Sequence, residues 1–459
     1  MEIEATDNNA EKLAVEWIES NLGGRVVASH SQGRWRNAWF FKLEKNGEIL
    51  PLYFRGHRPG LGKDTRRLKF ELKVYEILKK YNLPVPEVYG FCPAPEGIVM
   101  EHCPGRANLA TADSKQEQEA VLDQYIDALA AMHKIPLEAF ESLSLPCPTT
   151  SEERGLADMA YWEKAFRQQK SRLGERAKPE PLIEFVLLWL KANVPENRDS
   201  TVFLHVDSGQ FIFEKNRLTA MLDFELAMLG DPAADLAGLR TRDLSEPLGD
   251  LRRAFARYEK ITAKKIDSNA VDFHTVRFAM MTPLPIAALC ACPPTGVNLP
   301  QYLGWYYTYS RVSIALIAKK QGITLTEPLL PTSSLLANEH QPVYSALRNQ
   351  IELLKKFPEG DEIQYQLDIA FRTAVYLQRI NDFSAVLEKD NLDDLSVILE
   401  RPIASMKQGL LLLESMVIEK GLSLSSMLVP FFYRYCQRHL FLLGPCLREL
   451  EGARLQPLS

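Results

Sequence analysis

The chain has 459 residues, of which 46% are hydrophobic and 25% charged, and its formal net charge is −5. This length is enough for two or three domains, and the composition is that of an ordinary globular protein. The small negative charge excludes the strongly basic character that nucleic-acid binding favours. The seven cysteines form neither a disulfide framework nor a zinc-ligand pattern. We therefore expect reduced thiols, a cytoplasmic location and no nucleic-acid partner.

No segment of the chain has the pattern of a signal peptide or a membrane span. The first residues are acidic and contain no apolar core segment, which a signal peptide requires. No run of about 18 apolar residues occurs anywhere, so we expect no contact with a membrane. The candidate strands of the N-terminal part end near residue 103, and Pro328–Ser334 is rich in Pro, Ser and Thr like a linker, so we expect three segments: 1–103, 104–330 and 331–459.

The first segment, 1–103, alternates helix and strand patterns. Apolar residues recur with a helix period in Ala10–Leu22, and Asn46-Gly47 predicts a tight hairpin turn. A second helix is expected at Thr65–Tyr81. The candidate strands are Arg25–Ser29, Ala38–Glu44, Ile49–Arg55, Gly90–Cys92 and Ile98–His102.

The other two segments are mainly helical by their periodicity. In the second segment, Gln116–His133 and Pro181–Ala192 have the helix period. In the third segment the expected helices are Gln341–Lys356, Glu362–Asp382, Leu392–Glu400, Pro402–Lys420 and Ser425–Leu450. Pro430 and Pro445 are expected to kink or split the last of these. Three roles remain open for these C-terminal helices: closing the substrate side, packing on the second segment, or forming a homodimer.

The most informative stretch runs from Phe203 to Gly238. Short apolar runs flank a turn that holds Asp207, and the run Leu218–Leu222 ends on Asp223. The pair Lys215-Asn216 predicts a hairpin between the last two runs. Two carboxylates are thus expected at the ends of neighbouring strands. Phosphoryl transfer uses such a pair, because one acid positions a hydroxyl and the other holds Mg²⁺ against the phosphates.

This stretch resembles the catalytic core of the aminoglycoside phosphotransferase and choline kinase-like families, which are relatives of the protein kinases. The matching pieces, in order, are His205-Val206-Asp207, Asp223-Phe224-Glu225, Gly230-Asp231-Pro232 and Asp235-Leu236-Ala237. The resemblance implies an α+β fold of the two-lobed, protein kinase-like type. Its small antiparallel-sheet N-lobe would be segment 1–103 and its large, mostly helical C-lobe segment 104–330. Segment 331–459 would be an added helical extension.

The resemblance also implies roles for the residues of the core. Asp207 would orient the acceptor hydroxyl and Asp223 would hold Mg²⁺, while His205 and Asp235 would brace the loop. One piece departs from the family pattern. The loop after Asp207 is two residues short, and Gln210 stands where the family has a metal-binding Asn. We expect the Gln210 side chain to supply an amide oxygen to the metal.

The first segment offers candidate nucleotide contacts by the same resemblance. Arg55 stands where the third strand of the family carries a phosphate-binding Lys, and Glu71 would pair with it; an ordinary surface ion pair is the alternative. Gly33 lies where the family has a phosphate-covering loop, although a plain hairpin loop fits nearly as well. Glu101 and Cys103 belong to the stretch whose backbone would hold the nucleotide base.

Taken as a member of this family, the chain is expected to move the γ-phosphate of ATP, with GTP as an open alternative, to a hydroxyl of a small molecule with the help of Mg²⁺. Arg55, Gln210 and the short loop favour a second reading, a catalytically impaired relative that binds nucleotide or a partner. A third reading is a nucleotidyl transferase on the same scaffold. The family pattern does not choose among acceptors.

Overall fold

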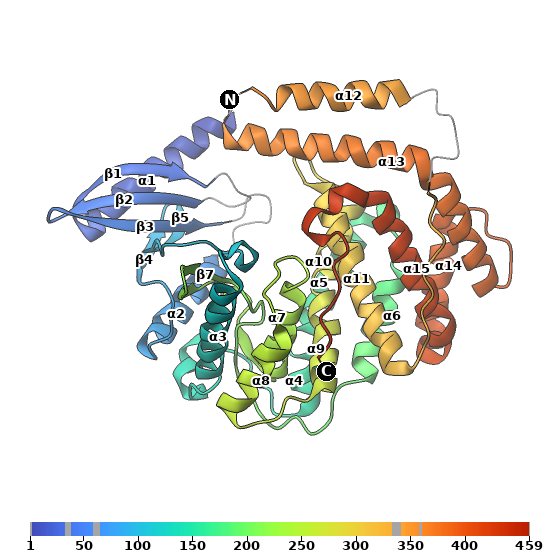
Figure 1. The fold of residues 1–459 in the computed structure, drawn as a ribbon, viewed down its shortest axis with the longest axis horizontal. Helices are drawn as coiled ribbons and strands as arrows, with labels where there is room; N and C mark the ends of the chain where they lie inside the picture. Colours follow the sequence, from blue (N-terminus) through green and yellow to red (C-terminus); the bar gives the residue numbers. More distant parts are fainter. Residues whose placement is uncertain (1, 33–37, 58–64, 333–340, 358–359, 459) are drawn as a thin grey trace. The chain divides into compact units, whose positions relative to one another are not determined.

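The computed structural model describes residues 2–32, 38–57, 65–332, 341–357 and 360–458 (Figure 1). Contacts divide the chain into two compact units. Unit 1 consists of Met1–Pro148, Ser200–Ile266 and Pro457–Ser459, and unit 2 consists of Thr149–Asp199 and Asp267–Gln456. Each unit is therefore built from segments that are separated in the sequence. The three-segment division expected from the sequence stays a prediction.

Unit 1 combines a sheet, two strand pairs and five helices in the described part of the chain. In chain order its elements are α1 (Glu2–Leu22), β1 (Arg25–Ser31), β2 (Ala38–Lys45), β3 (Glu48–Gly56), α2 (Thr65–Lys80), β4 (Val88–Pro93), β5 (Glu96–Glu101), α3 (Lys115–Met132), β6 (Val202–Leu204), β7 (Phe211–Glu214), β8 (Arg217–Met221), β9 (Met228–Gly230), α7 (Ala233–Arg242) and α8 (Leu251–Thr262).

The larger sheet of unit 1 is antiparallel and has the strand order β1-β2-β3-β5-β4. Asn46 and Gly47 have φ angles of 54° and 80° at the β2–β3 turn, as the predicted hairpin requires. Helix α1 packs on one face of this sheet through Ala14 and Ile18, against Trp39, Phe41, Leu43, Leu52, Phe54 and Val99. Since successive side chains of a strand point to opposite faces, Arg55 belongs to the face that α1 leaves open.

Two short strand pairs of unit 1 position Asp207 and Asp223. Strand β6 pairs with β9, and β7 pairs with β8 as the predicted hairpin. The turn between β7 and β8 contains Lys215, with a φ of 52°. Asp207 follows β6 and Asp223 follows β8, so both carboxylates come directly after strand ends, as expected from the sequence.

The regular structure of the described residues of unit 2 is helical. Its α-helices are α4 (Ser151–Leu156), α5 (Met159–Leu173), α6 (Pro181–Ala192), α9 (Ser268–Met280), α10 (Pro283–Ala291), α11 (Leu299–Gln321), α12 (Gln341–Leu354), α13 (Asp361–Ile398), α14 (Met406–Lys420) and α15 (Ser425–Leu443). Helix α11 packs against α9, α10 and α15, and α6 packs against α14. The Trp189 ring of α6 is buried and stacks on Phe273 of α9 with a 6.2 Å centroid distance.

The C-terminal helices differ from the sequence prediction in two places. The helices expected at Glu362–Asp382 and Leu392–Glu400 form one continuous helix, α13. The linking residues contain no Gly or Pro, and Leu387 continues the buried face. Pro430 lies inside α15 without ending it, whereas Pro445 follows Gly444, where α15 stops.

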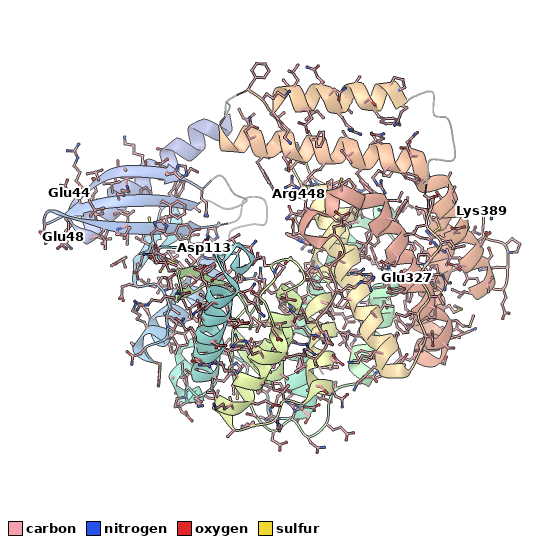
Figure 2. All side chains as sticks on the ribbon, in the orientation of Figure 1. Glu44, Glu48, Asp113, Glu327, Lys389 and Arg448 are labelled. Carbon is pink, nitrogen blue, oxygen red and sulfur yellow. The ribbon has the colours of Figure 1, made fainter. Side chains whose placement is uncertain are left out.

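Charged side chains lie on the surface of both units, together with exposed apolar side chains such as Leu329 and Val397. Figure 2 shows Glu44 and Glu48 beside the β2–β3 turn and Lys389 on α13. Lys389 pairs with Asp393 one turn further along the helix, with 2.6 Å between nitrogen and oxygen. Among the helices described, none combines the length and the apolar character needed to cross a bilayer.

Candidate functional site

Asp207 lies in the turn after β6, and residues on either side of it in this turn have positive φ angles. Val206 has a φ of 70° and Gly209 a φ of 94°; a positive φ is rare for a β-branched residue and marks local strain. Strain of this kind persists only where surrounding contacts over-determine it. The contacts that hold this turn therefore identify the supporting structure of the site.

Asp235 of α7 holds the turn from beneath. Its Oδ2 atom accepts the backbone N–H of His205 at 3.0 Å, and its Oδ1 atom accepts that of Val206 at 2.6 Å. The His133 ring donates from Nε2 to the same carboxylate at 2.8 Å. Burial alone would raise the pKa of Asp235, but the hydrogen bond and charge of His133 outweigh burial and lower it. Asp235 is thus an ionised, fully buried brace.

His205 is the second brace of the turn. Its Nε2 lies 2.8 Å from the Leu222 carbonyl oxygen, which can only accept, so Nε2 carries the proton. Its Nδ1 then accepts the Tyr125 hydroxyl at 3.2 Å, and that hydroxyl accepts the Gly209 N–H at 2.7 Å. Burial lowers the pKa of His205, which keeps the ring neutral. A neutral ring with both nitrogens occupied supports the loop and leaves no nitrogen for proton transfer.

The turns that carry Asp207 and Asp223 are tied together through Leu222. The Leu222 carbonyl accepts from His205, and its N–H donates to the Gln210 carbonyl at 3.0 Å. The side chains of Asp207 and Asp223 remain 25% and 21% exposed. Both carboxylates are therefore held by one hydrogen-bonded framework and are still open to a ligand.

Both oxygens of Asp207 already have donors. The Arg242 Nη2 atom of α7 lies 2.6 Å from Oδ1, and the Gln210 Nε2 atom donates to Oδ2 at 2.6 Å. Gln210 was predicted as a metal ligand through its amide oxygen; the structure shows its amide nitrogen on Asp207. Arg242 was not predicted. Its sequence signal is limited to a basic residue in the last turn of α7.

Arg55 connects the sheet, α2 and the turn after β8. Its Nε atom lies 2.7 Å from Oε2 of Glu71, so the predicted pair is present. Its Nη2 atom forms an ion pair with Asp223 and lies 3.4 Å from Oε2 of Glu225. Asp223 itself has a φ of 65°, and its N–H donates to the Tyr75 hydroxyl of α2 at 3.0 Å.

Arg55, Glu71, Asp223 and Glu225, which we call the Arg55 cluster, bring one positive and three carboxylate groups together in a largely buried position. Burial raises the pKa of Glu71, and the nearby carboxylates of Asp223 and Glu225 add to this, while Arg55 opposes it. Burial would lower the pKa of Arg55, but Asp223 and Glu71 raise it well above its ordinary value. Arg55 is thus a permanent cation between three carboxylates, which is an arrangement that can exchange a carboxylate for a phosphate oxygen.

The other predicted nucleotide contacts are placed as follows. Gly33 lies outside the described residues. Glu101 ends β5, where its N–H donates to the Glu87 carbonyl at 2.8 Å and its side chain accepts the Glu87 N–H at 3.1 Å. Cys103 follows two residues later and is buried, which raises the pKa of its thiol to about 12. These residues do not contact Arg55 or Asp207 in the structure; their predicted role involves backbone groups.

Few side chains of the site could act as ligands of a metal ion. Among the described residues, no group of three or more His, Cys, Asp or Glu side chains is arranged to hold a metal. Asp223, Glu225 and the Gln210 amide oxygen are nevertheless hard oxygen donors, the type that Mg²⁺ prefers, and Mg²⁺ usually takes one or two carboxylates together with phosphate oxygens. The residues present therefore fit a metal that is shared with a bound phosphate group.

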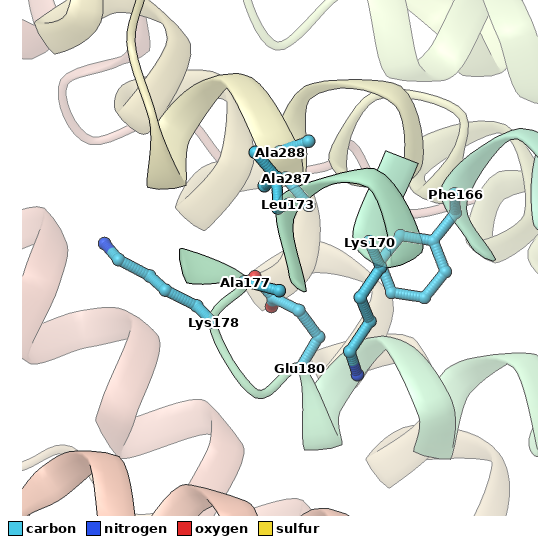
Figure 3. Close-up of a pocket in the computed structure, with 8 residues that line it drawn as sticks. All are labelled: Phe166, Lys170, Leu173, Ala177, Lys178, Glu180, Ala287 and Ala288. Atoms are coloured by element: carbon cyan, nitrogen blue, oxygen red, sulfur yellow. The ribbon is translucent and has the colours of Figure 1, made fainter. Parts of the chain in front are cut away.

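A small pocket lies in unit 2 (Figure 3). Its polar lining includes Lys170, Lys178 and Glu180. Glu180 accepts a hydrogen bond from the Tyr306 hydroxyl, and burial raises its pKa to about 7. None of the residues predicted for the site lines this pocket.

Comparisons with known proteins place the chain in a family. The sequence profile of the phosphotransferase enzyme family (APH) matches residues 28–267, more than half of the chain. The chain therefore belongs to the phosphotransferase enzyme family. The match contains the residues of the site described above, and the predicted fold class, protein kinase-like α+β with a small antiparallel sheet and a mostly helical remainder, is confirmed.

Curated relatives match a part of their length. The chain is 27% identical over 227 residues to acyl-CoA dehydrogenase family member 11 of Gallus gallus, which covers 47% of this chain and 28% of that protein. It is 26% identical over 178 residues to acyl-CoA dehydrogenase family member 10 of Mus musculus, covering 36% of this chain and 16% of that protein. The chain thus spans less than a third of these relatives.

The solved structures that match the chain include a macrolide phosphotransferase and an aminoglycoside phosphotransferase. The apoenzyme of macrolide 2'-phosphotransferase MphH from Brachybacterium faecium is 18% identical, with a TM-score of 0.42, 61% of this chain covered and 98% of that one. A thermostable mutant of aminoglycoside phosphotransferase APH(4)-Ia, in a ternary complex with AMP-PNP and hygromycin B, is 14% identical, with a TM-score of 0.46, 67% of this chain covered and 99% of that one.

Proposed function

We propose that the protein transfers the γ-phosphate of ATP to a hydroxyl group of a small molecule, assisted by Mg²⁺. The observation that carries the proposal is the Arg55 cluster together with the adjoining Asp207 turn. The Arg55 guanidinium is held by Glu71 and forms an ion pair with Asp223. Hydrogen bonds of Leu222, the residue before Asp223, connect it to the turn that holds Asp207. This brings a phosphate-binding cation, a metal-binding acid and a hydroxyl-orienting acid into one framework.

Arg55 acts on the nucleotide phosphates in this proposal. A guanidinium offers several donors in a planar fork that matches phosphate oxygens. Glu71 keeps the side chain extended from β3 through the 2.7 Å contact at Nε, which leaves the Nη atoms for a ligand. Asp223 and Glu225, now on Nη2, would exchange places with phosphate oxygens when the nucleotide binds.

Asp223 and the Gln210 amide oxygen would hold Mg²⁺, with Glu225 as a further oxygen donor. The ion, when bound, neutralises phosphate charge that the protein alone leaves uncompensated. Gln210 also donates to Asp207 at 2.6 Å, so one side chain would link the metal side of the site to the acceptor side.

Asp207 orients the acceptor in this proposal. A carboxylate that aligns a hydroxyl with the phosphorus gains rate mainly by positioning, because the bound geometry replaces a search in solution. The base of the nucleotide would lie at Glu101–Cys103, where the Cys103 N–H has no hydrogen-bond partner among the described residues. A backbone contact of this kind fits both adenine and guanine, so GTP is an alternative donor.

A second candidate is a nucleotide-binding protein without transfer activity. The specific observation in its favour is that Asp223 is ion-paired with Arg55 and that the Gln210 amide is engaged with Asp207. If these contacts persist when nucleotide binds, Asp223 cannot hold a metal against the phosphates. The two candidates differ in one measurable property, the coupling of nucleotide binding and transfer to Mg²⁺.

The test combines binding and turnover with matched variants. Thermal unfolding is followed with ATP and with GTP, each with Mg²⁺ or with EDTA, and a library of hydroxyl-bearing metabolites is screened for transfer by mass analysis of products. We expect Mg²⁺-dependent stabilisation that Asp223→Asn removes, and transfer that Asp207→Asn lowers on the order of 10²-fold or more. The control is Asp113→Asn, since the Asp113 side chain is 80% exposed.

The outcomes separate the candidates. Stabilisation by nucleotide without any transferred group, in the wild-type protein and in Asp207→Asn alike, supports the binding protein. Products heavier by a nucleotidyl group instead of a phosphate contradict both candidates. A wild-type protein that no nucleotide stabilises contradicts the assignment of the Arg55 cluster as a phosphate site.

A further inference from the structure

Arg242 contacts the central carboxylate of the site from a distant place in the sequence. It is the last residue of α7 and follows Asp207 by 35 positions. Its side chain is 17% exposed, so it lies at the border between protein and solvent. The family pattern recognised in the sequence contains no residue of this kind at this place.

The position of the Arg242 side chain depends on Gly209, which lies in the turn that carries Asp207. A Cβ atom added at Gly209 would lie 3.1 Å from Cγ of Arg242 and 3.1 Å from Cδ1 of Leu239. Contacts that short are tighter than ordinary packing, so a larger residue at 209 would push the arginine stem away. The absence of a side chain at Gly209 thus leaves room for the Arg242 side chain that arrives from α7.

The Arg242 guanidinium has two acidic neighbours at different distances. Nη2 lies 2.6 Å from Oδ1 of Asp207, whereas Nη1 lies 3.5 Å from Oε1 of Glu246. Glu246 is 38% exposed, and an exposed pair at this distance is weak. The shorter, less exposed contact fixes the position of the guanidinium, and that contact is to Asp207.

We propose that Arg242 is a positioning residue for the Asp207 carboxylate, an inference that rests on the proposed phosphotransfer function. An ionised carboxylate has about four lone-pair sites on its two oxygens. Arg242 occupies one on Oδ1 and Gln210 one on Oδ2, which prevents rotation of the carboxylate plane. One lone pair on each oxygen remains for an acceptor hydroxyl, in a direction that the two donors define.

This role differs from that of a catalytic residue and from that of a purely structural one. Arg242 donates to Asp207, whereas Arg55 donates to Glu71 and Asp223. Its loss is expected to change the rate of the transfer step and to leave nucleotide affinity alone. A structural residue would instead lower stability and affect both quantities together.

The experiment uses water as the acceptor, because the natural acceptor is unidentified. In the expected reaction with Mg²⁺ and ATP, a bond forms between water oxygen and the γ-phosphorus, the bond from that phosphorus to the bridging oxygen breaks, and ADP, inorganic phosphate and a proton are released. Rates are measured for Arg242→Ala, Arg242→Lys and the control Arg252→Ala, which removes an exposed arginine of α8. Thermal unfolding of each variant verifies folding.

We expect Arg242→Ala to lower kcat on the order of 10- to 100-fold while KM for ATP changes less than about twofold. Arg242→Lys keeps the charge but loses the planar fork. Its kcat should therefore lie between that of the wild type and that of Arg242→Ala. Millimolar guanidinium chloride should restore part of the rate of Arg242→Ala, because the small cation can occupy the vacated place beside Asp207. Arg252→Ala should show neither the loss nor the rescue.

Several results would overturn the inference. Unchanged kcat in Arg242→Ala contradicts it, and so does a loss of kcat that comes with a matching rise in KM and no rescue by guanidinium. If Arg242→Ala unfolds, Arg242→Gln, which keeps most of the stem, is used with the same criteria. A wild-type protein that binds no Mg-ATP, or that transfers phosphate neither to water nor to any hydroxyl of the library, contradicts the proposed function and this inference together. Wild-type hydrolysis with normal Arg242 variants contradicts only the inference.

Discussion

Asp235 holds the turn that carries Asp207 through several buried hydrogen bonds. It binds two consecutive backbone N–H groups and the His133 ring while fully buried. Because its pKa is lowered in the folded protein, its stabilising contribution is complete above the ordinary value of 3.8 and is lost as pH falls through the lower, folded-state pKa. The brace therefore operates throughout the neutral range.

We predict that Asp235→Asn lowers the free energy of unfolding by about 3 kcal/mol at pH 7, because the amide cannot accept all three donors and leaves buried groups unsatisfied. Urea unfolding measures the change. The matched variant Asp113→Asn removes an exposed acid of the same unit and should change stability by less than about 0.5 kcal/mol. Equal effects of the two substitutions would show that Asp235 is not a brace.

At the scale of single residues, the order of the motifs in the sequence identified most of the candidate site residues, but it could not predict every contact between them. Asp207, Asp223, Arg55 and Glu71 were placed by the family pattern, and the structure brings Arg55, Glu71 and Asp223 into direct contact. Their roles stay predictions. Arg242 was missed because its contact arises only when α7 packs under the turn; neither its spacing nor its neighbours in the sequence distinguish it from an ordinary helix-end arginine.

At the scale of elements, α7 approaches the turn that carries Asp207 very closely. A Cβ atom added at Gly238 would lie 2.2 Å from the Val206 carbonyl oxygen and 3.2 Å from the Ser208 nitrogen. Both are backbone atoms, which cannot move without moving the turn. The glycine is thus what allows Asp235, on the same helix, to reach the N–H groups of the turn.

We predict that Gly238→Ala destabilises unit 1 by about 1–3 kcal/mol, since the overlap with backbone exceeds the gain of about 1 kcal/mol that Ala gives over Gly inside a helix. Thermal unfolding measures the loss. The comparison is Gly360→Ala, where an added Cβ would have nothing within 4 Å. A Gly238→Ala protein that is as stable as the wild type would contradict the close approach.

The elements themselves were largely predictable from local pattern. The strands and the Asn46-Gly47 turn follow from alternation and turn chemistry, and α6 has the predicted bounds. Two expected helices proved to be the single helix α13 because periodicity alone does not show whether a weakly apolar linking stretch stays helical. There Asn391 is buried and accepts a hydrogen bond from Arg438 at 2.7 Å, a contact that no local pattern contains.

At the scale of the whole molecule, each unit contains a buried acid with a shifted pKa, lowered for Asp235 in unit 1 and raised for Glu180 in unit 2. In unit 2, burial raises the pKa of Glu180 from 4.5 to about 7, against the opposing hydrogen bond from Tyr306. A raised pKa means that the folded form binds the proton more tightly. The contribution of Glu180 to stability is therefore complete below pH 4.5 and is lost as pH rises through about 7.

We predict that Glu180→Gln raises the free energy of unfolding above pH 7 and removes a loss on the order of 1–3 kcal/mol that the wild type shows as pH rises from 4.5 to 7. Gln keeps an oxygen for the Tyr306 hydroxyl. Urea unfolding across this range measures the difference, with the exposed Glu175→Gln as the matched control. Parallel pH profiles of wild type and Glu180→Gln would refute the assignment.

The division into units was the part least accessible from the sequence. The pattern predicts where helices lie, but not that 149–199 packs with residues beyond 267. That pairing is decided by contacts such as Trp189 with Phe273, and the Glu414 carboxylate with the Glu180 N–H at 2.7 Å. Homodimer formation through the C-terminal helices stays a prediction.

The interleaved order of the two units has a consequence for synthesis. On the ribosome, the acid-bearing unit can close as soon as residue 266 has left the exit tunnel, because all but its last three residues have then been made. Helix α6 emerges earlier, yet its partners in α9 and α14 are translated later. We therefore expect the nascent chain to expose the apolar, leucine-rich helix α6 until α9 and α14 have been translated.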